Sequence, residues 1–202
     1  MFKTLLYLSG RIYIPKDEIY KVGPRLLHIS DTPSLLFSEL ARVIKRFEPD
    51  YIIHTGDLVD NIKLQLHPGA IRHYEREVLA LLRTLNTSSA KKVYISLGNH
   101  DAVEYIKKKC GRIEVYEDYG QIEIEGVKIA FSHYANLILE KYADLYLFGH
   151  DLTTRSKHEE HRVLLNGISA LHIIDLDNLD IKYYEYPWGI DDARLNKRRI
   201  GF

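Results

Sequence analysis

Five short apolar stretches of the sequence are each followed by polar residues of kinds that bind metal ions or transfer protons. An Asp or His in such a place usually does no more than cap a turn, but five in the same position indicate a shared site. Carboxylate, amide oxygen and imidazole together are the donor set of Mn, Fe, Zn and related divalent ions. The five groups are Asp31, Gly56-Asp57, Gly98-Asn99-His100-Asp101, Ser132-His133 and Gly149-His150-Asp151.

The stretches that precede these groups have the pattern of buried strands alternating with amphipathic helices. Residues 25–30, 51–55 and 92–97 are short and nearly all apolar, as strands buried on both faces are. Residues 34–47 and 70–85 repeat apolar side chains at helical spacing, and Ser34 could cap the first of these helices. This order predicts parallel strands with crossover helices. Ligands of such sheets bind beyond the carboxyl ends of the strands, where the polar groups stand.

The second half of the chain has a different texture, with short strands joined mostly as hairpins. Glu125-Gly126 is a hairpin turn between two of them, and residues 135–142 are expected to form a short helix. We expect one domain over residues 1–202, with residues 1–23 as a hairpin or irregular arm and 187–202 as a tail. The predicted strands are residues 113–115, 121–124, 127–131, 145–148, 163–165, 170–175 and 181–186.

Composition limits the classes of protein. Lys plus Arg and Asp plus Glu both number 28, so the net charge is zero, which argues against a protein that lives on nucleic acid. The basic run 194–199 is read as a solvated tail. The single cysteine, Cys110, allows no internal disulfide. The short apolar start is followed by Arg11 and Lys16, and no stretch is long enough to span a membrane, so we expect a cytoplasmic protein without a signal peptide.

The polar groups, in order, resemble the five sequence blocks of the calcineurin-like metallophosphoesterases. The matching blocks are Leu26-Leu-His-Ile-Ser-Asp31, Gly56-Asp-Leu-Val-Asp60, Gly98-Asn-His-Asp101, Ser132-His133 and Gly149-His150, followed by Asn166-Gly-Ile-Ser169. The resemblance implies an α/β fold of two facing mixed β-sheets flanked by helices, a four-layer αββα sandwich. It also implies a two-metal site at the shared edge of the sheets, which cleaves phosphate mono- or diesters by metal-activated water.

The resemblance assigns a role to each matching residue. Asp57 would bridge two metal ions, and Asp31 would serve the first of them. His100 would donate a proton to the leaving group, and Asp101 would orient its imidazole. The ligands that would complete the second metal site are Asn99, His133 and His150.

Two positions depart from the family pattern. Pro33 and Leu152 stand where the family has histidine ligands of the first metal. We therefore expect one tightly held ion, Mn, Fe or Zn, and a second site that binds Mn or Mg weakly. His158 and His161 could in principle replace the missing ligands, although an exposed loop is the expected place for both.

Two functions remain open from the sequence. One is a working phosphoesterase acting on a phosphorylated small molecule or other phosphoester. The alternative is a catalytically impaired binding or scaffold protein of the same fold, similar to the retromer scaffold subunit. His100 and Asp101 favour the first, and Pro33 and Leu152 favour the second. A nucleic-acid enzyme has only the basic run in its favour, and the oligomeric state is open.

Overall fold

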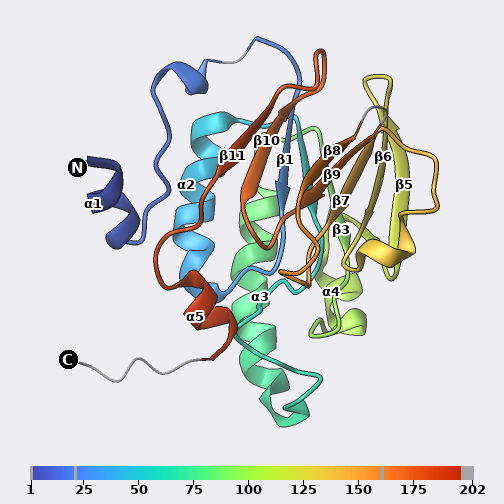
Figure 1. Cartoon of the computed structure of the whole chain (residues 1–202). Helices are drawn as coiled ribbons and strands as arrows, with labels where there is room; N and C mark the ends of the chain where they lie inside the picture. The colour runs from blue at the N-terminus through green and yellow to red at the C-terminus, as the bar shows by residue number, and fades with distance from the viewer. Residues whose placement is uncertain (1, 21, 160–161, 197–202) are drawn as a thin grey trace.

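Strands that are apolar on both sides form the centre of the first β-sheet. A computed structural model describes residues 2–20, 22–159 and 162–196 (Figure 1). The sheet has the strand order β11-β10-β1-β2-β3-β4. Strands β1 to β4 run parallel to one another, and β10 is antiparallel to both of its neighbours, β1 and β11. Its strands are β1 (Arg25–Ile29), β2 (Tyr51–His54), β3 (Lys92–Ser96), β4 (Glu114–Tyr116), β10 (Leu171–Asp175) and β11 (Ile181–Tyr184).

The second sheet is built from the middle of the chain, in the order β5-β6-β7-β9-β8. Hairpins join only its edges, because β6, β7 and β9 run parallel to one another. The charged strand β8 (Lys157–Glu159) is one that the apolar pattern did not predict. The other four strands are β5 (Tyr119–Ile124), β6 (Val127–Ser132), β7 (Leu145–Phe148) and β9 (Arg162–Asn166). The prediction of an α/β fold with two facing mixed sheets and flanking helices is confirmed.

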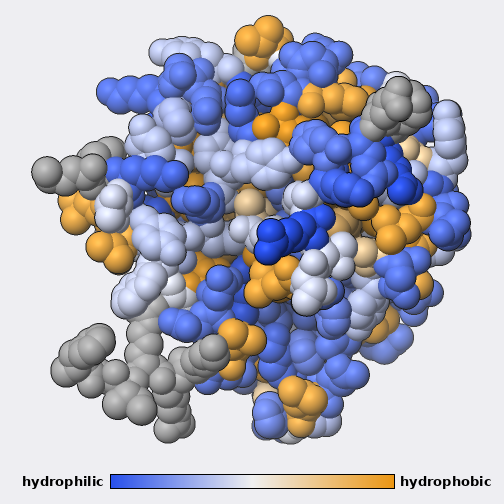
Figure 2. Space-filling model, viewed as in Figure 1, coloured by the Kyte–Doolittle hydropathy of each residue, from blue (hydrophilic) through white to orange (hydrophobic). Residues whose placement is uncertain are grey.

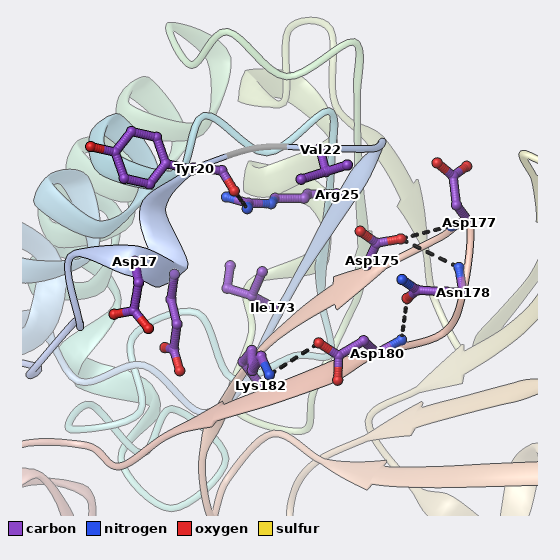
Figure 3. A pocket seen from close by; sticks show the side chains of 11 residues that line it. Asp17, Tyr20, Val22, Arg25, Ile173, Asp175, Asp177, Asn178, Asp180 and Lys182 are labelled. Carbon is purple, nitrogen blue, oxygen red and sulfur yellow. Dashed lines mark hydrogen bonds and ion pairs between the residues drawn. The ribbon is translucent and has the colours of Figure 1, made fainter.

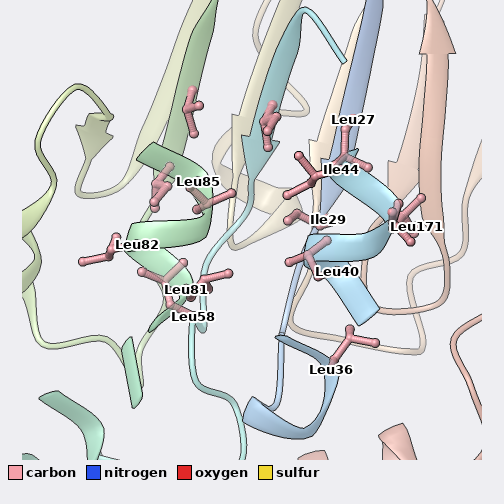
Figure 4. Packing of buried hydrophobic residues seen from close by; sticks show 14 of the residues in the cluster. Leu27, Ile29, Leu36, Leu40, Ile44, Leu58, Leu81, Leu82, Leu85 and Leu171 are labelled. Atoms are coloured by element: carbon pink, nitrogen blue, oxygen red, sulfur yellow. The ribbon is translucent and has the colours of Figure 1, made fainter. Parts of the chain in front are cut away.

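Alternation along the strands divides the core into layers. Leu27 and Ile29 of β1 face α2 (Phe37–Phe47), where they pack near Leu40 and Ile44 (Figure 4). Leu26, one position away, points instead to the second sheet. The helices α3 (Ile71–Asn86) and α4 (Val103–Lys109) extend the same outer layer over β2 and β3. The two cores hold the sheets rigidly, so that their edges can support a precise site.

Several local predictions were wrong. The N-terminal segment begins with the helix α1 (Phe2–Leu8), followed by an extended stretch and the 3-10 turn η1 (Asp17–Ile19), so it is not a hairpin. A short apolar run does not distinguish strand from helix. The expected helix 135–142 is reduced to the 3-10 turn η4 (Ala135–Leu137), beside a small cluster on the outer face of the second sheet. Residues 187–196 contain the helix α5 (Ile190–Arg194).

The remaining 3-10 turns begin the two long helices. The turn η2 (Ser34–Leu36) precedes α2, and Ser34 makes no capping hydrogen bond through its side chain, contrary to expectation. The turn η3 (Pro68–Ala70) precedes α3. Cys110 follows α4 as a free thiol.

The surface shown in Figure 2 is mostly hydrophilic, with hydrophobic residues in small separate patches. Across the described part of the chain, no helix combines the length and the apolar character needed to cross a membrane.

Candidate metal centre

The residues that follow β1, β2, β3, β6 and β7 meet at one edge of the two sheets. The backbone joins the loops there, since the N–H of Asp31 donates to the carbonyl of Gly56 at 3.0 Å, and the N–H of Gly149 to that of His133 at 3.2 Å. A cavity of 380 Å³ opens at this edge. The residues of the strand-end loops that line it are Asp31, Asp57, Asp60, Lys63, His100, His150, Asp151 and Leu152.

Four of the five predicted ligands touch one another in a chain. The Oδ2 atom of Asp31 accepts the backbone N–H of His150 at 3.0 Å. The Nδ1 atom of His150 lies 3.1 Å from Nε2 of His133, which lies 3.5 Å from Oδ2 of Asp57. One ligand atom from each of Asp31, Asp57 and His133 lies within 4.8 Å of the other two. The structure therefore brings these side chains to one point, as the strand-end argument predicted.

Asn99 reaches the same region through Tyr134. The Tyr134 hydroxyl donates to Oδ1 of Asn99 at 3.0 Å, and its ring lies 4.6 Å from that of His150 between centroids. The Nδ2 atom of Asn99 donates to Gln65 at 2.7 Å and contacts Nε2 of His100 at 3.1 Å. These contacts orient the amide, with its oxygen toward Tyr134, which packs on His150, and its nitrogen toward His100 and Gln65.

The backbone at the site is held in unusual conformations. Asp31, Asp57 and His150 have φ angles of 49°, 53° and 68°, in the left-handed region that residues other than glycine seldom adopt. Gly98 and Gly149 permit the close packing, because a Cβ at Gly98 would collide with the Asp57 carboxylate and one at Gly149 with Asp31. Such strain persists where the surrounding structure imposes it, and it gathers at functional sites.

The hydrogen bonds of His133 suit it to a metal ion. Its Nδ1 atom lies 2.8 Å from the carbonyl oxygen of Thr55, to which it must donate, so the neutral ring keeps a lone pair on Nε2 beside Asp57 and His150. Burial opposes a charge on His133, but contact with the Asp57 carboxylate raises its pKa to about 9. Burial likewise opposes a charge on Asp57, but the hydrogen bond to His133 lowers its pKa to about 2. A cation of borderline softness fits this mixed nitrogen and oxygen set, where it would take the place of the proton.

The Asp101 carboxylate, which was expected to orient the His100 ring, binds backbone N–H groups and a tyrosine hydroxyl instead. Its Oδ2 atom accepts the backbone N–H groups of Asp57 and Gly98 at 2.9 and 2.8 Å. Its Oδ1 atom accepts the N–H of Leu58 at 2.9 Å and the hydroxyl of Tyr74 at 2.6 Å. Asp101 therefore ties the loop after β2 to the loop after β3. Burial, reinforced by the negative charge of Asp57, raises its pKa to about 6.

The His100 ring makes no hydrogen bond to Asp101. Its Nε2 atom accepts from the Asn99 amide, so the neutral ring carries its proton on Nδ1. That Nδ1 atom is buried and has no hydrogen-bond partner among the described residues, and the residue lines the cavity at 8% exposure. Burial lowers the pKa of His100, the Asp57 charge acts against this, and the Lys63 charge lowers it further. A buried N–H without a partner, on a residue that lines a cavity, calls for an explanation, and a hydrogen bond to a ligand is one.

Asp60 and Lys63 belong to the site but were not assigned from the sequence. Ligand atoms of Asp57, Asp60 and His100 lie within 4.8 Å of one another, and Asp60 is only 2% exposed. Burial, together with the charges of Asp31 and Asp57, raises the pKa of Asp60 to about 8. Lys63 forms an ion pair with Asp60. The signal available was their spacing, with Asp60 three residues after Asp57 and Lys63 three residues further on.

Arg194 is not part of a solvated tail, and that reading was wrong for this residue. It is 3% exposed, and its Nε donates to the carbonyl of Asp31 at 2.7 Å and Nη1 to that of Ile168 at 2.7 Å. Its guanidinium lies 4.4 Å from the centre of the Tyr186 ring. A buried guanidinium needs acceptors, and strand-end carbonyls supply them. Residues 197–199 of the basic run lie outside the described residues.

His28 and His54 are fully buried inside their strands, as expected. His54 connects two of the loops at the site, since its Nε2 contacts the Thr32 hydroxyl and its Nδ1 accepts the N–H of Gly56 at 3.2 Å. His28 pairs with His172, Nδ1 to Nδ1, at 3.0 Å.

A second cavity, of 580 Å³, is larger but lacks comparable chemistry (Figure 3). It lies between the N-terminal segment and the turn joining β10 to β11. Its carboxylates serve local structure, because Asp175 accepts the N–H groups of Asp177 and Asn178, and Asp180 pairs with Lys182 at 3.1 Å. We therefore place the site at the strand ends, in the smaller cavity.

Comparison with known families agrees with this geometry. The family model described as calcineurin-like phosphoesterase matches residues 24–197. The chain belongs to the calcineurin-like phosphoesterase family. The match covers both sheets and all five polar groups, so the fold and the family expected from the sequence are confirmed.

Individual relatives of this family are distant. A curated one, the UDP-2,3-diacylglucosamine pyrophosphatase LpxG of Chlamydia trachomatis serovar D, is 28% identical over 101 residues, which are 47% of this chain. The match spans only 28% of that relative's length.

Solved structures show the same fold at low identity. A novel archaeal phosphodiesterase aligns with a TM-score of 0.54 at 16% identity, over 79% of this chain and 98% of its own. Yfce, a phosphoesterase from E. coli, gives 0.53 at 14% identity, over 81% and 99%. A Vps29 variant from Entamoeba histolytica gives 0.50 at 16% identity, over 81% and 92%.

The two departures from the family pattern lie where the resemblance located them. Pro33 is buried directly after the Asp31 turn, and Leu152 is exposed at the rim of the cavity. Asp151 also lines the cavity, but its carboxylate accepts hydrogen bonds from Thr153 and Thr154 in its own turn. His158 contacts the Tyr183 hydroxyl at 2.7 Å and is absent from the ligand clusters of the described chain. His161 lies outside the described residues.

Proposed function

We propose that this chain is a metal-dependent phosphoesterase that cleaves a phosphate mono- or diester by metal-activated water. The observation that carries the proposal is the contact of His133 with both Asp57 and His150, together with the lining of one cavity by Asp57, His150 and His100, whose Nδ1 has no partner among the described residues. Family membership supports the reaction class. A scaffold has no evident need for a histidine that lines a cavity and leaves a buried ring nitrogen unpartnered.

The metal would be held by Asp57, Asn99, His133 and His150, with Asp31 at its edge. When bound, a divalent ion lowers the pKa of a coordinated water and offsets negative charge on phosphoryl oxygens. The hydrogen bond from His133 to Thr55 fixes the tautomer, so that Nε2 is the nitrogen at which an ion would replace the proton. Nitrogen ligands favour Mn, Fe or Zn at this position over Mg.

His100 would act on the leaving group. His100 lines the cavity, and its buried Nδ1–H has no partner among the described residues, so we assign it to donate to the oxygen that departs from phosphorus and to stabilise that oxygen as the ester bond breaks. Asp101 would act indirectly, as a positioning residue that holds the Asp57 loop against the loop that carries His100.

The test is metal-dependent turnover with a matched pair of variants. The purified protein, stripped and reloaded with Mn²⁺, Zn²⁺ or Mg²⁺, is offered an aryl phosphate monoester, an aryl phosphate diester and a nucleoside diphosphate ester. The last substrate is included because LpxG is named as a pyrophosphatase. Asp57→Asn should abolish turnover, whereas His73→Asn, a change at an exposed histidine on α3, should leave it unchanged.

Two results would contradict the proposal. Turnover that survives both chelation and Asp57→Asn would come from another protein or another site. A protein that binds metal tightly yet hydrolyses none of the three substrate classes would favour the alternative, a binding module that has kept the fold but lost the reaction.

A further inference from the structure

Three buried carboxyl groups converge at the cavity, and as anions they carry more negative charge than one divalent ion offsets. Asp31, Asp57 and Asp60 are each 2% exposed. Buried carboxylates that lie close together are stable as anions only when cations or hydrogen bonds compensate them. The proposed ion on Asp57 compensates one side of the group, and Asp60 lies on the other side.

Asp60 is built firmly into the part of the site that has lost the family's histidines. Its backbone N–H donates to the carbonyl of Thr32 at 3.0 Å, directly before Pro33, and the N–H of Thr32 donates to the carbonyl of Asp57 at 3.0 Å. These bonds hold the Asp60 backbone beside the Asp31 and Asp57 loops. With Pro33 and Leu152 in place of imidazoles, the nitrogen donor that the described residues place beside Asp60 is His100, to which the proposed function gives the role of proton donor.

Lys63 supplies a positive charge on this side. Its ammonium forms an ion pair with Oδ1 of Asp60, and its side chain is 20% exposed. The loop that carries Lys63 is closed by its own carbonyl, which accepts the N–H of His67 at 2.8 Å and that of Leu66 at 2.9 Å. Lys63 lines the same cavity as His100. An ammonium has three N–H donors, so one on Asp60 leaves others for an anion in the cavity.

We propose that the Lys63 ammonium takes the place of the second metal ion of this site, neutralising Asp60 at rest and binding a phosphoryl oxygen of the substrate. The proposal rests on the phosphoesterase function proposed above. A lysine does this as a point charge, and its flexible stem lets it reach both groups. The result is a site with one metal ion and one fixed organic cation, which explains how the reaction could persist without the two histidines.

The test uses Lys63→Met, the charge-keeping Lys63→Arg and the control Lys45→Met, a change at an exposed lysine on α2 outside the cavity. The binding of inorganic phosphate to the Mn²⁺-loaded full chain is measured by calorimetry, and bound Mn²⁺ is counted by equilibrium dialysis. Neither measurement requires turnover. Thermal unfolding followed by circular dichroism establishes that each variant is folded, and Lys63→Gln replaces Lys63→Met if the latter is not.

Lys63→Met should weaken phosphate binding about ten- to a hundredfold, the range expected for one charged hydrogen bond. The same variant should bind more Mn²⁺ per chain than the parent, because Asp60 then lacks its cation. Lys63→Arg and Lys45→Met should match the parent in both measurements.

Three outcomes decide the matter. If Lys63→Met binds phosphate as tightly as the parent does, the phosphate contact is refuted. If its Mn²⁺ count does not rise, the ammonium is not standing in for an ion. If the parent binds Mn²⁺ but no phosphate, the phosphoesterase proposal fails together with the phosphate contact, and the Mn²⁺ counts still decide whether Lys63 replaces an ion.

Discussion

Replacing Asp101 by asparagine should weaken both folding and metal binding, because one side chain satisfies four donors from three parts of the chain. The carboxylate accepts the N–H groups of Asp57, Gly98 and Leu58 and the hydroxyl of Tyr74. An asparagine keeps one acceptor oxygen and turns an NH₂ group toward the other pair of donors. Two hydrogen bonds to a charged group are lost, each worth about 1.5–3 kcal/mol. The expected loss is about 3–6 kcal/mol, a large part of the roughly 5–15 kcal/mol that a domain has.

The loss is measured by urea unfolding at pH 8, above the Asp101 pKa of about 6, so that the parent carboxylate is ionised. The midpoint should fall while the slope stays constant, which identifies a change in stability. Mn²⁺ affinity should fall about 10- to 100-fold, as is typical when a residue that orients metal ligands is removed. Tyr74→Phe removes only one donor and should cost about 1 kcal/mol. Asp118→Asn, at an exposed aspartate, should cost nothing measurable.

The experiment separates two roles for Asp101. If the residue only oriented the His100 ring, Asp101→Asn would lower turnover and leave stability and Mn²⁺ affinity near the parent values. A stability loss under about 1 kcal/mol with unchanged Mn²⁺ affinity would refute the role derived from these contacts.

Three further predictions follow from the same geometry. His100→Asn should lower turnover about 10²- to 10⁴-fold in steady-state kinetics while the Mn²⁺ content stays constant, and unchanged turnover would remove His100 from the mechanism. Pro33→His combined with Leu152→His should raise the Mn²⁺ count at a fixed free concentration; two tightly bound ions in the unmodified protein would refute the asymmetry. Burial lowers the pKa of His28 and, to about 3, that of His172, so the unfolded chain binds more protons below pH 6.5. Stability should therefore fall by about 1.4 kcal/mol per histidine for each pH unit below about 6, with a smaller slope in urea unfolding of His172→Asn.

The sequence was sufficient to predict the first sheet and the convergence of the ligands, because both follow from local patterns. Residues 25–30 and 51–55 are nearly all apolar and are each followed by a helical pattern, which predicts buried parallel strands, and parallel strands end at the same edge. The charged strand β8 and the helix α5 were missed for the opposite reason. Strand β8 is charged and owes its structure to pairing with its neighbour β9, whereas Arg194 of α5 binds carbonyls far away in the chain, those of Asp31 and Ile168.

Roles that depend on which atoms face each other could not be predicted. Asp101 follows His100 in the chain, yet the turn directs its carboxylate to backbone N–H groups instead of to the ring. Asp60 and Lys63 look like an ordinary surface pair at i,i+3 spacing, and only the fold shows that the aspartate is buried against two other carboxylates. The i,i+3 spacing shows only that Asp60 and Lys63 can meet. Which other charges surround them depends on the folded structure.

The strained backbone at the strand ends is held by parts of the chain that lie outside positions 33 and 152. Asp31, Asp57 and His150 hold left-handed backbone conformations, which cost about 1–3 kcal/mol each. The two packed cores, the hydrogen bonds between the loops and the ties made by Asp101 and Arg194 hold these conformations in place. The ties join the side chains of Asp101 and Arg194 to backbone groups, and neither position 33 nor position 152 takes part in them. The frame of the site is therefore independent of the residues at these two positions, which is what the proposed replacement of an ion by the Lys63 ammonium requires.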